Sequence, residues 1–232
     1  MAEPYEFKAF AGSSHLILIR LIRRWAPRGR LLDLGSWTGD LGAAVRDHFA
    51  KTFALERSVS NLPELRRRFD SVLIADLELT PQLPPSLDAI VLADVLEHVR
   101  GPQELLACAT KVLSPGGKIF ISIPNVANVA IRVSLLFGRF EYAEKGILDS
   151  THLRFFTRAS ARRLIRSAGL VIQEETVSSV PIRLAFPRAP GVLISIAEKI
   201  LLLVTPLLPT LLGYQFIFVA ADRDSAGGGR QG

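Results

Sequence analysis

Two acidic residues follow short apolar runs in a pattern that suits a nucleoside ligand. Glu56 follows the run Thr52–Leu55, about 20 residues beyond a glycine-containing turn, and Asp76 closely follows Val72–Ile74. A carboxylate at the first position can accept hydrogen bonds from both hydroxyls of a ribose. A carboxylate at the second position can accept one from an adenine amino group. The spacing therefore predicts a site for an adenosine-type ligand.

The glycine turn is the part of this pattern that lets the backbone approach a ligand. The run Leu31–Leu34, which contains Asp33, leads into Gly35 and Gly39. Glycine permits close backbone approach, and the helix expected after the turn offers free N–H groups at its N-terminus. Trp37 stands in the middle of the turn, where a positive φ would strain it. Its bulk also disfavours a dinucleotide oxidoreductase, whose pyrophosphate needs close backbone approach.

Two histidines are candidates for a general base, because imidazole titrates near neutral pH. His98 follows the fourth predicted strand, and its alternative role is a hydrogen bond that fixes the loop. His152 lies between Asp149 and Arg154, a cluster that could orient a polar or anionic substrate. The alternative for His152 is a structural polar network. We favour His152 as the base.

Alternating elements must position these residues. Over residues 31–125, short apolar runs alternate with segments of helical spacing, which predicts an α/β fold with a parallel sheet. Ligands of such sheets bind at the carboxyl edge, where the acidic groups would meet. Ser14 and Thr157 are expected helix caps, and Tyr214–Ala221 is expected to be the last strand. Residues 126–156 show no clean period, which is typical of a functional segment.

Taken together, these motifs resemble a class I S-adenosylmethionine-dependent methyltransferase. The resemblance covers residues 14–177 and includes two further runs, DAIVLADVLEHV at 88–99 and LSPGGKIFISIPN at 113–125. The run Gly138–Thr157 is similar to a bacterial group often linked to glycan and lipid-sugar pathways. The chain is also distantly similar to the methionine-biosynthesis W-type proteins.

The resemblance implies a Rossmann-like α/β fold, with a seven-stranded, mostly parallel sheet, helices on both faces and an antiparallel last strand. It implies S-adenosyl-L-methionine as the cofactor and S-adenosyl-L-homocysteine as its product. The residues assigned to the cofactor would shape the glycine loop, hold the ribose, frame the adenine or line the site near the reactive methyl group. They are Asp33, Gly35, Ser36, Trp37, Gly39, Glu56, Asp76, Leu77, Ala93 and Asp94.

The substrate side is expected in residues 126–156, interpreted as a lid whose aromatic residues could stack on a sugar or apolar group, or as satellite core. Candidate substrate residues are Asn125, Arg132, Tyr142, Asp149 and Arg154. No metal ligand set is expected. We further expect an N-terminal helical cap at 1–29, a methyltransferase domain at 30–224 with a hydrophobic helical insertion at 190–212, and a flexible tail at 225–232.

Hydrophobicity is concentrated near the C-terminus of a chain that is 49% hydrophobic, with a mean hydropathy of +0.29. Gly191–Gly213 is long enough to span a bilayer, but Glu198 and Lys199 lie within it, and Pro206 and Pro209 interrupt its second half. Its polar stripe is narrow, so we expect a helix buried on most sides, in the core, over the cleft or against a second subunit. Contact with a membrane surface and a membrane span are the alternatives.

Composition limits the function classes. The 232 residues carry a formal charge of +6, and a single cysteine excludes an internal disulfide. The arginines lack an aromatic stacking platform, so no nucleic-acid partner is expected. We expect a cytoplasmic methyltransferase that acts on an oxygen of a sugar, glycan or lipid-linked small molecule. It would be peripheral to the inner membrane if the insertion meets lipid. A non-catalytic S-adenosylmethionine-binding partner protein is the alternative, and a homodimer is left open.

Overall fold

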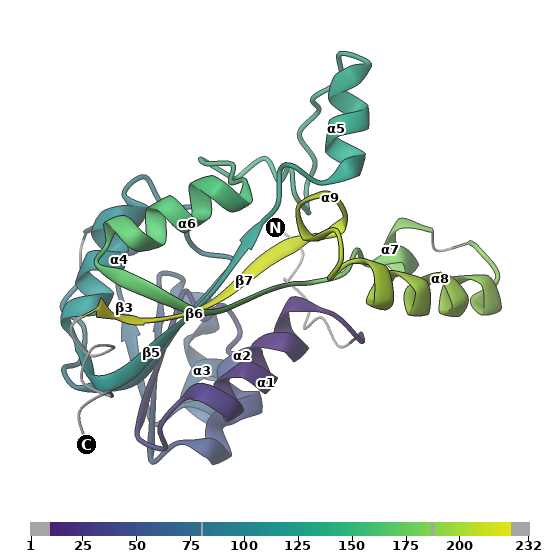
Figure 1. Ribbon diagram of the computed structural model, residues 1–232. Helices are drawn as coiled ribbons and strands as arrows, with labels where there is room; N and C mark the ends of the chain where they lie inside the picture. The colour runs from purple at the N-terminus through teal and green to yellow at the C-terminus, as the bar shows by residue number, and fades with distance from the viewer. Residues whose placement is uncertain (1–9, 80, 187, 224–232) are drawn as a thin grey trace, which may run out of the picture.

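The sheet expected from the sequence is present in the computed structural model, which describes residues 10–79, 81–186 and 188–223 (Figure 1). The seven strands are β1 (Arg30–Leu34), β2 (Lys51–Glu56), β3 (Ser71–Ile74), β4 (Leu87–Ala93), β5 (Leu113–Pro124), β6 (Leu170–Val177) and β7 (Gln215–Asp222). Their order in the sheet is β3-β2-β1-β4-β5-β7-β6. The strands from β3 to β5 pair in parallel, and β7 lies antiparallel between β5 and β6. The predicted Rossmann-like fold with an antiparallel last strand is confirmed.

Helices cover both faces of this sheet. The longer ones are α1 (Ser14–Trp25), α4 (Pro102–Lys111), α5 (Val129–Leu136), α6 (Arg158–Ser167) and α8 (Gly191–Val204). The shorter ones are α2 (Asp40–Val45), α3 (Leu62–Arg68), α7 (Ile182–Ala185), α9 (Pro209–Leu212) and the 3₁₀ turns η1 (Arg46–His48), η2 (Val59–Asn61) and η3 (Leu77–Leu79). Figure 1 shows α4 and α6 on one side of the sheet, with α1, α2 and α3 on the other.

Side-chain alternation along β5 separates two hydrophobic cores. Ile119, Ile121 and Ile123 pack with residues of α4 and α6. Phe120 points to the opposite face and packs with residues of α1 and α2. All four side chains are fully buried. Because the sheet is buried on both faces, its strands read in the sequence as continuous apolar runs.

Two helix starts test the predicted caps. Thr157 caps α6 as predicted, in a capping box with Ser160. At the first helix, the cap is Ser13 rather than Ser14: the Ser13 hydroxyl accepts a hydrogen bond from the Leu16 N–H at 3.3 Å. The prediction was one residue late because the cap needs extended backbone, which Ser13 has, whereas Ser14 is already helical and its side chain is buried.

Residues 126–156 contain a helix that the sequence did not indicate. Asn128 caps α5, because its side-chain oxygen accepts a hydrogen bond from the Ala130 N–H at 3.0 Å. None of the α5 residues is buried, and all of them are described. A helical period of apolar residues arises when one face of a helix packs on the protein. Since α5 has no such face, its sequence did not indicate a helix.

The hydrophobic insertion forms α8, a turn and α9. The helix is not buried in the core, because Ile194 is the only buried residue among the fully described residues 191–204. Contact with a second subunit or with a membrane surface stays a prediction. Across the three described ranges, no helix is long and apolar enough to cross a membrane. Helix α8 ends before Pro206. The predicted tail at 225–232 lies outside the described residues.

Candidate active site

A cleft of about 1000 Å³ opens at the carboxyl ends of β1, β2 and β4. The strand order reverses between β1 and β4, which is where ligands bind in open α/β sheets. Every predicted cofactor residue except Gly39 lines this cleft. Gly39 instead forms the N-cap of α2, where an added Cβ would meet Phe69 and Leu65 at 2.6 and 2.8 Å.

The backbone of the glycine turn is strained at Trp37, as a positive φ at that position would require. Gly35 has a φ of +70°, and a Cβ there would lie 2.9 Å from the Val95 side chain. Trp37 adopts a φ of +50°, a conformation that costs a non-glycine residue about 1–3 kcal/mol. Its backbone N–H donates a hydrogen bond to Glu56 Oε2 at 2.9 Å. The carboxylate at the end of β2 therefore holds the strained turn in place.

The Glu56 carboxylate and its surroundings fit an adenosyl group. The second oxygen, Oε1, accepts from the Ser58 N–H at 2.9 Å, so the group is fixed while each oxygen keeps a further lone pair. Asp76 is oriented in the same way by the Glu78 N–H at 3.0 Å. The indole Nε1 of Trp37 is buried and has no hydrogen-bond partner among the described residues. The cleft thus offers acceptors for hydroxyl or amino groups beside the Trp37 side chain.

Asp33 is an acid of the cleft whose pKa is strongly raised. Its side chain is almost fully buried. Burial raises the pKa of the Asp33 carboxyl to about 7, and the negative charge of Glu56 adds to the rise. A hydrogen bond from the Gly42 backbone N–H acts in the opposite direction. Asp33 therefore titrates near neutral pH beside the glycine turn, and its charge depends on conditions.

Asp94, directly after β4, is held by side chains of β5 and β7. Its backbone has a φ of +57°. Oδ1 accepts from the Ser122 hydroxyl at 2.7 Å and from Gln215 Nε2 at 2.5 Å. Neither partner was predicted, because Gln215 starts a strand 121 residues farther along the chain and nothing in its local sequence marks it as polar support for a site.

His98 lines the cleft and has its tautomer set by Thr151. The Thr151 hydroxyl donates to Asp149 Oδ1 at 2.6 Å, so it can only accept from His98 Nδ1 at 3.2 Å. The Thr151 carbonyl, 3.3 Å from the same nitrogen, is also only an acceptor. Nδ1 of His98 therefore carries the hydrogen, and neutral His98 keeps a lone pair on Nε2.

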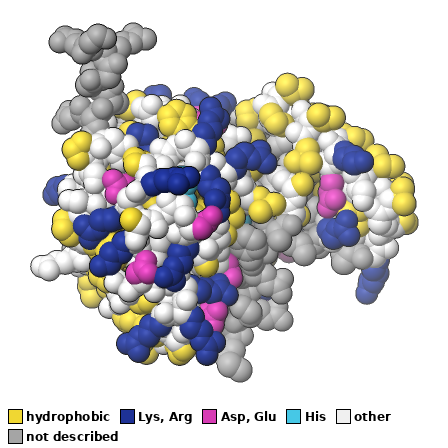
Figure 2. All heavy atoms as spheres, turned by 90° about the horizontal axis from the view of Figure 1, so that it is seen from below, with side chains coloured by type: hydrophobic (Ala, Val, Ile, Leu, Met, Phe, Trp, Pro, Cys, Tyr) yellow, Lys and Arg dark blue, Asp and Glu magenta, His cyan; other side chains and the backbone are white. Residues whose placement is uncertain are grey.

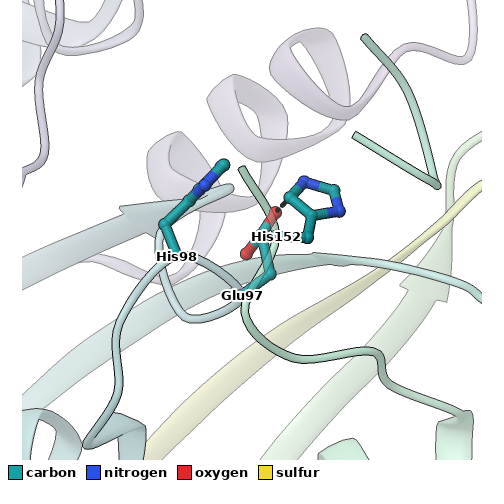
Figure 3. A group of neighbouring side chains, drawn as sticks. All are labelled: Glu97, His98 and His152. Atoms are coloured by element: carbon teal, nitrogen blue, oxygen red, sulfur yellow. Dashed lines mark ion pairs between the residues drawn. The ribbon is translucent and has the colours of Figure 1, made fainter. Parts of the chain in front are cut away.

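His152 lies behind His98, away from the cleft. Figure 3 shows His98 and His152 with Glu97 between them. The His152 and Glu97 side chains are each 1% exposed, and His152 Nε2 lies 4.0 Å from Glu97 Oε1. His152 Nδ1 is 3.1 Å from the Ile147 carbonyl oxygen. Burial, and then the neighbouring His98, lower the pKa of His152, against smaller opposing effects. Burial thus disfavours the charged form of this imidazole.

The same three residues are the set that could hold a metal ion. Among the described residues, Glu97, His98 and His152 each offer one ligand atom, and these atoms lie within 4.8 Å of one another. One carboxylate and two imidazoles form a donor set found at divalent transition-metal sites. The sequence interpretation included no metal, and it did not single out Glu97. The signal was present in the adjacent Glu97 and His98, but only the fold brings His152 to them.

The predicted substrate residues are not gathered in one place. Asp149 lines the cleft. Asn125 is buried and fixes the end of β5, because its Nδ2 donates to the carbonyls of Thr210 and Gly213 at 2.9 and 2.8 Å. The remaining three are exposed and line neither cavity described here: Arg132, Tyr142 and Arg154. Only Asp149 therefore shares the cleft with the predicted cofactor residues.

A second, apolar cavity of about 500 Å³ adjoins the cleft. Its lining includes Ile131 of α5, Leu201 of α8 and Leu212 of α9. Lys145 lines both the cavity and the cleft. The two spaces are thus separated by the segment that carries Lys145, and the second one suits an apolar group.

Known proteins resemble this chain in sequence. A family model described as a methyltransferase domain matches residues 13–175. The ubiquinone biosynthesis O-methyltransferase of Burkholderia pseudomallei (strain 1710b) is 30% identical over 159 residues, which cover 64% of this chain and 67% of that protein. The protein of the same name from Idiomarina loihiensis is 32% identical over 103 residues, 41% of this chain and 42% of that protein. The chain thus spans less than half of the latter relative.

Solved structures resemble the fold. An S-adenosylmethionine-dependent methyltransferase from Mesorhizobium loti has a TM-score of 0.61 at 17% identity, covering 90% of this chain and 98% of that one. Another from Clostridium acetobutylicum has a TM-score of 0.60 at 12% identity, with 90% of each chain covered. At these identities the likeness concerns the fold alone.

Proposed function

The chain belongs to the methyltransferase domain family, and from this premise we propose that it transfers the methyl group of S-adenosylmethionine to a hydroxyl oxygen of a small molecule. The family assigns the cofactor, which when bound supplies a sulfonium-activated methyl group. Two relatives named O-methyltransferases, at 30% and 32% identity, support oxygen as the acceptor atom. The observation that carries the proposal is the cleft that brings Glu56 and Asp76 together with His98.

In this proposal, the cofactor's polar groups are bound by fixed acceptors. Glu56 accepts from the ribose hydroxyls, because both of its oxygens are already oriented by backbone N–H groups. Asp76 accepts from the adenine amino group. Gly35 lines the cleft on the side proposed for the methionine part, and a side chain there would collide with Val95. Pre-oriented groups of this kind lower the entropy lost on binding.

We infer that His98 is the general base. Its Nδ1–H is engaged by Thr151, which leaves Nε2 as the atom that accepts a proton from the acceptor hydroxyl. Asp149 orients Thr151 and favours the positive charge that His98 gains. This assignment is better supported than a base role for His152, which lies buried outside the cleft lining. His152 is then a positioning residue behind His98.

The acceptor was expected to be a sugar, glycan or lipid-linked compound. The apolar cavity that shares Lys145 with the cleft supports the last of these classes. A hydroxyl-bearing head group would occupy the cleft, and a hydrocarbon portion would fill the cavity. Burying hydrocarbon there contributes about 0.8 kcal/mol per methylene group. A free sugar would leave the cavity unused.

The cofactor part of the proposal is tested by calorimetry with S-adenosylhomocysteine. We expect binding in the micromolar range and none with a nicotinamide dinucleotide. Absence of binding to S-adenosylhomocysteine would contradict the proposal. Transfer of labelled methyl groups is then measured on hydroxyl compounds with and without a hydrocarbon chain. Cofactor binding without transfer to any acceptor would favour a non-catalytic binding protein.

The base is tested with a matched pair of variants, His98→Ala and His152→Ala. General-base catalysis contributes about 10²–10⁴-fold, so His98→Ala is expected to lower kcat at least 100-fold with little change in S-adenosylhomocysteine affinity. It should also remove the acidic limb of the pH–rate profile. His152→Ala should retain that limb. Loss of the limb in His152→Ala, and its retention in His98→Ala, would reverse the assignment.

A further inference from the structure

Helix α8 has two apolar faces, although only one of them packs on the molecule. Ile194, Leu201 and Thr205 face inward: Ile194 and Thr205 are buried, and Leu201 lines the apolar cavity. The opposite side carries a row of apolar residues spaced three or four apart, which places them on one helix face. We call this row the α8 outer face. Its helical residues, 50–75% exposed, are Val192, Ile196, Ile200 and Leu203, and Leu207, 76% exposed in the turn after α8, is counted with them.

Neighbouring elements extend the exposed apolar surface. Leu208, just before α9, is exposed, and so are Leu136 and Phe137 at the end of α5. Figure 1 shows α5 and α8 projecting from the body of the molecule, and Figure 2 shows hydrophobic side chains gathered over the lobe where α8 lies. Contiguous exposed apolar surfaces of this kind mark interaction sites. Some second body must therefore cover the α8 outer face.

The charges around the α8 outer face are predominantly basic. Lys199 is exposed, and the helix period puts it at the edge of that face beside Leu203. Glu198, the acidic residue of the helix, is turned to the other side and lies 3.7 Å from Arg183. Arg188, just before the helix, is exposed as well. An apolar face flanked by cations is complementary to a surface that offers both hydrocarbon and negative charge.

These observations favour a lipid bilayer over a second copy of the chain. In a symmetric pair joined through the α8 outer face, the two Lys199 side chains would meet at the same seam. A projecting ridge also buries little area against a rigid surface, whereas a fluid interface can close around it. The fourteen residues of α8 reach about 21 Å, less than the roughly 30 Å of hydrocarbon in a bilayer. The helix is therefore suited to lie along the interface.

We propose that the α8 outer face is a membrane-docking surface, which rests in the headgroup region of an anionic bilayer. The apolar side chains of α8 enter the acyl boundary, and Lys199 stays at the level of the lipid phosphates. Docking does not rest on the proposed methyl transfer, since it is measured without turnover.

The test is flotation of the full chain with vesicles of phosphatidylcholine, alone or mixed with phosphatidylglycerol. Wild type should float with the mixed vesicles and much less with the neutral ones. Leu203→Glu and Leu207→Glu should each weaken binding by about tenfold or more, because each inserts a charge into the buried face. Val59→Glu is the matched control: Val59 is 65% exposed on η2, outside both cavities, and this variant should bind like wild type.

Circular dichroism and thermal melting establish that each variant is folded. Wild type that fails to float with mixed vesicles overturns the proposal, and so does equal binding of Leu203→Glu and Val59→Glu. Light scattering tests the alternative that a second copy of the chain covers the α8 outer face. A dimer that Leu203→Glu dissociates, in the absence of vesicle binding, would assign the α8 outer face to a second copy.

Discussion

The candidate active-site cleft and the apolar extension formed by α5, α8 and α9 adjoin one another, yet they are built in opposite ways. In the cleft, polar side chains are partly or fully buried, and fixed partners orient them: Glu56 holds the Trp37 backbone, and Asp94 is held by Gln215. In the extension, large apolar side chains are exposed, and Leu136 and Leu203 are 80% and 75% accessible. Lys145 lines a cavity on each side of the boundary.

This difference teaches how one chain can combine specific and adaptable recognition. Residues that follow a strand buried on both faces inherit a fixed position, which a site for one small molecule requires. A helix with a single packed face is held less tightly and presents its other face to whatever covers it. The cleft is therefore expected to respond to single polar substitutions, and the extension to changes in apolar or charged character.

The largest effect is expected from Asp33→Asn in the cleft. Because the folded pKa of Asp33 is raised to about 7 from 3.8, its protonated form stabilises the fold below about pH 4. That contribution is lost as pH rises through about 7. The difference in free energy of unfolding between wild type and Asp33→Asn should therefore change by roughly 4 kcal/mol over this interval. Urea unfolding at several pH values measures it.

Asp47→Asn is the control for this pH dependence. Asp47 is an exposed acid paired with Arg23, which lowers its pKa. Its loss should leave the shape of the stability curve above pH 5 nearly unchanged. If the free energies of unfolding of wild type and Asp33→Asn changed in parallel with pH, the buried carboxyl would not be titrating in this range. Asp33 would then be better solvated than its burial indicates.

An intermediate effect is expected from Glu56→Gln. The amide keeps the shape of the side chain but not the charge that accepts from Trp37, Ser58 and, in our proposal, the ribose. Hydrogen bonds to charged groups contribute about 1.5–3 kcal/mol, so S-adenosylhomocysteine affinity should fall by roughly 10- to 100-fold. Glu104→Gln, on the exposed surface of α4, should not change it. Equal affinities in calorimetry would remove Glu56 from the cofactor site.

The smallest effect is expected from Lys199→Gln in the extension. A lysine near an anionic membrane contributes about 1 kcal/mol, so binding to mixed vesicles should weaken by about fivefold. S-adenosylhomocysteine affinity should be unchanged, which separates the two regions. Flotation at low and high salt checks the result, because the wild-type advantage should shrink as salt screens it. A loss of cofactor binding in this variant would mean that the regions are coupled.

Much of the fold was predictable because the sheet is buried on both faces. Strands β1, β2 and β4 appear in the sequence as apolar runs, and the acids after them could be assigned to one edge. Helix α6 was also predictable, since Thr157 and Gly169 mark its ends. Helix α5 was not, because it has no buried face to impose a period.

The site was less predictable where its parts come from distant segments. Both histidines were candidates in the sequence, but only the fold shows that His98 lines the cleft and His152 is buried behind it. The bond from Gln215 to Asp94 crosses 121 residues and leaves no local signal. The same holds for Asn125, which was assigned to substrate but whose amide is engaged by the carbonyls of Thr210 and Gly213.

By itself, the sequence determined the fold class, the family and the group of residues at the carboxyl edge of the sheet. These depend on the local period of apolar residues and on the spacing of glycines and acids, both of which can be read from short stretches of the sequence. Only the tertiary structure decided which histidine meets the cleft, what supports Asp94, and that α8 turns a full apolar face outward. Those properties depend on which segments pack together, and burial and hydrogen bonding between distant segments are set by the whole chain.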